Sequence, residues 1–137
     1  MKRVALIPCS KNKIKTGGEV KAVDLYSASL LFRKILHFVL KQKYDKIFII
    51  SAKYGLLRLN QKIQYYDSSL KNISKIERVK WGDIISSKLN KILDKSDYID
   101  FYIPKIYIKY ISKNLQINHK NILQGMRIGE RLHFLST

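Results

Sequence analysis

The sequence has few of the residues that form disulfides or metal centres. Its single cysteine, Cys9, cannot form an internal disulfide and excludes a zinc site built from several cysteines. The three histidines, His37, His119 and His133, are scattered and do not have the spacing of metal ligands. We therefore expect no metal and no cofactor.

Long apolar runs are also missing. The first run, residues 4–8 (VALIP), is too short for the core of a signal peptide. No run approaches the roughly 20 apolar residues that a membrane-spanning helix needs. We expect a cytoplasmic protein with no membrane partner, and no obligate protein partner is evident.

Acidic residues are scarce. The chain of 137 residues has 27 lysines and arginines but only 10 aspartates and glutamates, so its formal net charge is +17. Such an excess is typical of proteins that bind a polyanion. We expect a nucleic acid as partner, with DNA favoured over RNA.

The hydrophobic residues, 46% of the chain, suffice for one domain over residues 1–137. Short apolar runs predict strands over residues 4–7, 46–50, 98–103 and 117–123. Apolar residues at helical spacing predict helices over residues 25–40, 73–93, 106–115 and 125–135. Polar connections occupy residues 9–23 and 51–71. This alternation favours an α/β three-layer sandwich, with a mainly parallel sheet of about four strands and helices on both faces.

Two polar segments follow the first two predicted strands, where ligands bind in open parallel sheets. Small residues there allow a ligand close to the backbone, and lysines and backbone N–H groups suit phosphate. The expected residues for binding a base or phosphate are Cys9, Ser10, Lys11, Lys13, Ser51, Lys53, Tyr54, Gly55 and Tyr66. The lysines would contact the phosphates of the nucleic-acid backbone, and Tyr54 or Tyr66 would stack on a base. The simpler interpretation of each segment is a turn with solvated lysines.

Two aspartates are candidate catalytic groups. Asp67 precedes a predicted helix, so it either caps that helix or stabilises a cationic sugar and orients water. Asp24 has the same two interpretations, with the cap favoured. Cys9 is either a small packing residue or a nucleophile, and no histidine near it in sequence would activate it.

Five segments carry a family resemblance: residues 6–13 (LIPCSKNK), 24–27 (DLYS), 51–56 (SAKYGL), 66–67 (YD) and 125–132 (GMRIGERL). Together they resemble a small prokaryotic and phage family of unknown function. That family is similar to the α/β domain associated with tRNA-guanine transglycosylase-like proteins of archaeosine synthesis and, at fold level, to uracil-DNA glycosylases. The resemblance implies a pocket for a base or nucleotide. The chain lacks the Gly-Gln-Asp-Pro-Tyr and His-Pro-Ser motifs of the uracil enzymes, so their catalytic residues do not transfer.

The sequence thus favours a base-processing enzyme, a DNA glycosylase-like hydrolase that cleaves the N-glycosidic bond of an extruded nucleotide, modified or unmodified. The alternative is a non-catalytic nucleic-acid- or nucleotide-binding protein of phage or defence type. The orientation of Asp67, into a crevice or onto a helix end, discriminates between them.

Overall fold

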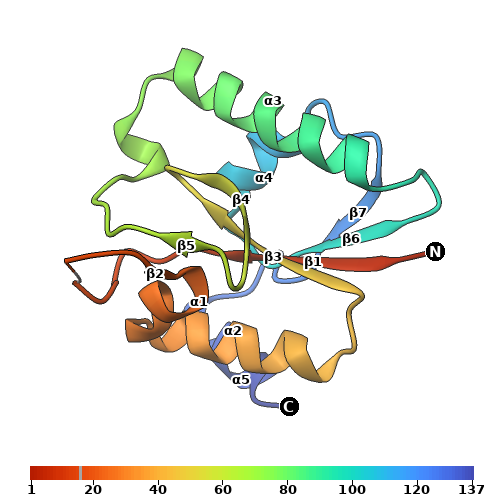
Figure 1. Ribbon diagram of the computed structural model, residues 1–137. Helices are drawn as coiled ribbons and strands as arrows, with labels where there is room; N and C mark the ends of the chain where they lie inside the picture. Colours follow the sequence, from red (N-terminus) through yellow and green to blue (C-terminus); the bar gives the residue numbers. More distant parts are fainter. Residues whose placement is uncertain (16) are drawn as a thin grey trace.

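The computed structural model describes residues 1–15 and 17–137 and has a five-stranded sheet in the order β4-β3-β1-β6-β7 (Figure 1). The strands are β1 (Arg3–Pro8), β3 (Lys46–Ser51), β4 (Gly55–Arg58), β6 (Tyr98–Phe101) and β7 (Asn118–Asn121). All neighbouring pairs are parallel except β3 and β4. The mainly parallel sheet is confirmed. It has one strand more than expected, because β4 lies in a segment interpreted as a loop.

Helices cover both faces of this sheet, which confirms the three-layer α/β class (Figure 1). One face carries α1 (Ala22–Leu25), the 3-10 helix η1 (Tyr26–Ala28), α2 (Leu30–Lys41) and α5 (Ile128–Leu135). The other face carries α3 (Lys75–Ile92) and α4 (Lys105–Ser112). Alternate residues of β1 serve the two cores: Ile7 packs in the cluster with α2, and Leu6 in the cluster with α3.

The helix predicted over residues 25–40 is interrupted. Ser29 has an extended backbone conformation, and its side chain accepts a hydrogen bond from the N–H of Phe32. Serine in this position starts a new helix, so α2 begins at Leu30 and a separate turn of helix precedes it. Helical spacing alone does not reveal such a restart.

Two short strands lie outside the main sheet. β2 (Val20–Lys21) and β5 (Lys62–Ile63) pair antiparallel as a small ribbon beside the carboxyl ends of the main strands (Figure 1). Both lie within the predicted connections 9–23 and 51–71, the first of which includes residue 16, outside the described residues. The second connection also contains the 3-10 helix η2 (Leu70–Asn72).

The direction of winding reverses between β1 and β6. From β1 the chain passes through α2, on one face, to β3, whereas from β6 it passes through α4, on the opposite face, to β7. The segments that leave these two neighbouring strands therefore diverge. In open α/β sheets this point is where a ligand crevice forms, outside the carboxyl ends of the strands.

Candidate functional site

Two hollows meet at this reversal point. The Asp67 hollow, about 480 Å³, is lined by residues that include Lys11, Lys13, Asp67, Lys71 and Tyr107. The Arg131 hollow, about 290 Å³, is lined by residues that include Leu31, Phe32, Ile35, Ile103 and Arg131. Both are lined by Cys9, Ser10, Lys11 and Pro104, which follow β1 and β6. Residues of α4 line the first hollow, and residues of α2 and α5 line the second.

Asp67 faces the hollow and caps no helix. The two helices that follow it are capped by other residues, because Ser69 accepts from the N–H of Lys71 and Ser74 from the N–H of Glu77. Asp67 itself is exposed, and within residues 1–15 and 17–137 its carboxylate has no hydrogen bond or ion pair. A carboxylate without a structural partner is free to act on a ligand.

Three lysines share the hollow with Asp67, and one of them is held in place by an aromatic ring. The Nζ atom of Lys13 lies 4.6 Å from the centre of the Tyr66 ring, a cation–π contact. Lys11 and Lys71 are exposed. Their ammonium groups add positive charge to the lining of the hollow, which suits phosphate groups.

Cys9 sits at the point where β1 leaves the sheet. Its backbone N–H donates to the carbonyl of Ile50 at 3.1 Å, and its Sγ lies 3.8 Å from the hydroxyl of Tyr107. Burial raises the pKa of Tyr107, so this hydroxyl stays protonated at neutral pH and is a poor base. Among the described residues no histidine lines either hollow. The contacts favour a packing role for the thiol.

The second segment lies differently from the first, because Ser51 is fully buried, with a relative exposure of 0%, and lines neither hollow. Its Oγ lies 2.9 Å from the hydroxyl of Tyr66 and accepts from the N–H groups of Lys53 and Tyr54 at 3.2 and 3.0 Å. Its carbonyl accepts from the indole Nε1 of Trp81 at 3.0 Å. These contacts stabilise a turn and leave no access for a ligand.

The segment after β3 is a hairpin with a three-residue loop, because β3 pairs antiparallel with β4 and Ser51 stands opposite Gly55. Gly55 has a φ of +73°, the left-handed conformation typical of the residue that closes such loops. Consequently neither Lys53 nor Tyr54 lines either hollow, although both lie at the expected edge of the sheet.

Tyr66 is also a structural residue in this fold. Its side chain is only 5% exposed, and its hydroxyl lies 2.6 Å from the hydroxyl of Tyr26. Burial raises the pKa of Tyr66 above its usual range, and burial likewise raises the pKa of Tyr26 to about 12. Both are therefore neutral hydroxyls at physiological pH. The ring of Tyr66 supports Lys13 and is not open for base stacking.

Asp24 lies apart from the two hollows. It is exposed on α1 and lines neither of them. Its backbone carbonyl accepts a hydrogen bond from the hydroxyl of Ser27 at 2.6 Å. Of the two candidate acids, only Asp67 is in the crevice.

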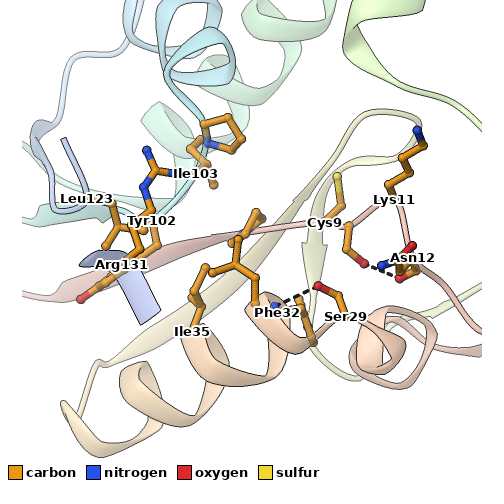
Figure 2. Close-up of a pocket in the computed structure, with 14 residues that line it drawn as sticks. Cys9, Lys11, Asn12, Ser29, Phe32, Ile35, Tyr102, Ile103, Leu123 and Arg131 are labelled. Atoms are coloured by element: carbon orange, nitrogen blue, oxygen red, sulfur yellow. Dashed lines mark hydrogen bonds between the residues drawn. The ribbon is translucent and has the colours of Figure 1, made fainter. Parts of the chain in front are cut away.

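The lining residues that were not predicted from the sequence as site residues include Pro104, Tyr107, Lys71 and Arg131. A signal existed for Pro104 and Tyr107, because they follow the third predicted strand, whose carboxyl end lies at the same edge. Arg131 reaches the crevice from α5, at the far end of the chain (Figure 2). Its Nε donates to the carbonyl of Met126 at 3.0 Å. Only the packing of α5 beside α2 brings it there.

The described residues contain no group of three or more histidine, cysteine, aspartate or glutamate side chains arranged to hold a metal ion. Among the same residues, no helix has both the length and the apolar character needed to cross a bilayer.

Comparison with known proteins gives a family but no activity. No curated protein matches the sequence. The similarities to transglycosylase-associated domains and to uracil-DNA glycosylases therefore stay expectations from the sequence. A family model described as "Family of unknown function (DUF6884)" matches residues 4–137, and the chain belongs to this family.

Proposed function

We propose that the protein is a nucleic-acid base-processing hydrolase, which cleaves the N-glycosidic bond of a nucleotide extruded into the crevice. The observation that carries this proposal is Asp67, an exposed carboxylate that caps no helix and shares a hollow with three lysines. Extrusion is the general route by which such enzymes reach a base.

The lysines of the Asp67 hollow supply the binding energy. Lys11, Lys13 and Lys71 hold the phosphates on either side of the extruded nucleotide. Lys11 and Lys13 belong to the segment that follows β1, and Lys71 lies within η2, so the three lysines come to the same hollow from two parts of the chain. Ser10 adds a hydroxyl to the same wall, although its Oγ already donates to the carbonyl of Asn12 at 2.5 Å.

Asp67 acts on the sugar. As the bond between C1′ and the base nitrogen breaks, the electron pair leaves with the base and positive charge develops on the sugar. The carboxylate of Asp67 stabilises that charge and orients a water, whose oxygen bonds to C1′. The proton released by the water passes through Asp67 to solvent, and the departing base takes up a proton from solvent.

The second candidate is a protein that binds nucleic acid or nucleotide without turnover. The basic lining and Tyr107, the one aromatic residue among the described residues of the Asp67 hollow, suffice for that role. Asp67 disfavours this alternative, because a carboxylate repels the phosphates that the hollow would bind.

The test is incubation with single- and double-stranded DNA, modified and unmodified, followed by alkali to reveal abasic sites. The wild type should produce alkali-labile sites on at least one substrate. Asp67→Asn should reduce cleavage by about 100-fold or more, since an amide does not stabilise a cationic sugar. Binding should stay equal or become tighter, because a negative charge leaves the hollow.

Asp24→Asn is the matched control, because it removes a carboxylate that lines neither hollow. It should cleave as the wild type does. Equal cleavage by Asp67→Asn and the wild type would remove Asp67 from the mechanism. If the wild type binds every DNA substrate but cleaves none of them, the result would favour the non-catalytic alternative.

A further inference from the structure

The Arg131 hollow has the walls of a pocket for a flat apolar group. Figure 2 shows it between the first turns of α2 and the segment that follows β6. Leu31, Phe32 and Ile35 of α2 line it, together with Ile103 and Pro104, which follow β6. Pockets for small molecules are typically lined in this way, with few polar groups.

The charged groups of this hollow are cations only. Lys11 and Arg131 line it at opposite sides (Figure 2), and no carboxylate is among its described lining residues. With Nε held by the carbonyl of Met126, the two terminal nitrogens of Arg131 have no protein partner in the described part of the chain. Both cations are hydrogen-bond donors and cannot accept.

The two hollows are neighbours and differ in size. At about 290 Å³ the Arg131 hollow is at the small end for a ligand pocket, large enough for one heterocycle and too small for a dinucleotide. It adjoins the Asp67 hollow across Cys9, Ser10 and Lys11. A sugar near Asp67 would place an attached group close to this opening.

We infer that the Arg131 hollow is the base subsite, and that it selects bases with an oxo edge over bases with an amino edge. This inference deepens the proposed function and rests on it for the placement of the sugar. The base lies between the apolar walls, and its edge meets the guanidinium of Arg131. Arginine pairs with adjacent acceptors such as O6 and N7 of an oxopurine, whereas an exocyclic amino group opposes its N–H groups.

Deoxyinosine and deoxyadenosine are matched probes, because their bases differ only in the oxo or amino group at C6 and in the hydrogen on N1 that accompanies the oxo group. Dissociation constants come from NMR titration of the intact protein with each nucleoside. Deoxyinosine should bind about tenfold more tightly than deoxyadenosine, the value of one good arginine pairing. Equal affinities for the two nucleosides would overturn the inference.

Two variants locate the binding. Leu31→Trp fills the hollow from α2 and should weaken deoxyinosine binding about tenfold or more. Leu30→Trp is its control, because Leu30 is the neighbouring residue, 52% exposed and outside both hollows, and it should bind as the wild type does. If Leu31→Trp binds deoxyinosine as tightly as the wild type does, the nucleoside binds elsewhere and the proposed subsite is overturned.

Arg131→Gln gives a readout that misfolding cannot imitate. Glutamine pairs with N6 and N7 of adenine, so the preference should reverse toward deoxyadenosine. A variant that keeps the preference for deoxyinosine would contradict the role of Arg131.

The proposed base subsite and the proposed hydrolase activity can be rejected independently of each other. Nucleoside binding that responds to these variants, in a protein that cleaves no DNA, supports the subsite and rejects the hydrolase. Cleavage of DNA that is insensitive to Leu31→Trp rejects the subsite and leaves the hydrolase in place.

Discussion

Three buried hydroxyl groups lie within hydrogen-bond distance of one another at the carboxyl end of β3. The hydroxyl of Tyr66 lies 2.6 Å from that of Tyr26 and 2.9 Å from that of Ser51. Ser51 ends β3, and Tyr26 packs in the same core cluster as Ile7 of β1. Since each hydroxyl is both donor and acceptor, the three satisfy one another without water.

At this scale we predict that Tyr66→Phe destabilises the fold by about 1–3 kcal/mol, because two buried hydroxyls lose a partner. Urea unfolding measures the change. Tyr65→Phe is the control, since the hydroxyl of Tyr65 has no hydrogen bond within residues 1–15 and 17–137. Equal stability of the two variants would show that water replaces the lost hydroxyl.

At the scale of elements, the contact between α3 and α4 depends on one glycine. A Cβ atom added at Gly82 would lie 2.2 Å from the carbonyl oxygen of Tyr110 and 2.6 Å from its carbonyl carbon. Both atoms belong to the backbone of α4, so no side-chain movement relieves the overlap. The close approach matters for the site because Tyr107, on the same helix α4, lines the Asp67 hollow.

We predict that Gly82→Ala destabilises the protein by roughly 1–3 kcal/mol, because the two helices must separate. In an ordinary helix the same replacement stabilises by up to about 1 kcal/mol. Gly129→Ala in α5 tests that expectation, since nothing lies within 4 Å of its added Cβ. Thermal and urea unfolding of both variants should give shifts of opposite sign; a stabilised Gly82→Ala would contradict the packing.

At the scale of the whole molecule, the net charge of +17 would dominate binding to a nucleic acid, the partner that we propose. We predict that log affinity falls linearly with log salt concentration, with about 0.7–0.9 counterions released per phosphate contact. Titration with a fluorescent oligonucleotide at several salt concentrations gives the slope. Affinity that is independent of salt would refute an electrostatic mode of binding.

A pair of variants separates the crevice from the general charge. Lys11→Ala, at the junction of the two hollows, should weaken binding more than Lys91→Ala, although each removes one positive charge. Lys91 lines neither hollow. Lys11→Ala should also reduce the slope of log affinity against log salt concentration by the amount that corresponds to about one phosphate contact.

Local sequence was a good guide to most of the elements and to the place of the segment that follows β1. A continuous apolar run such as residues 46–50 is typical of a strand that is covered on both faces. It therefore predicts a central strand, whichever strands lie beside it. The segment after β1 was correctly placed at the carboxyl edge, because a parallel strand ends there in any order of strands. Cys9, Ser10 and Lys11 therefore line the crevice as expected.

What only the tertiary structure decided is which neighbours face that segment. Local pattern cannot say that β3 turns back into a hairpin while β6 winds the opposite way, yet this choice buries Ser51 and brings Asp67 and Arg131 to the two sides of Cys9. The reason is physical. Burial and helical period are properties of short stretches of chain, whereas a crevice forms where strands distant in sequence pack side by side and their connections diverge.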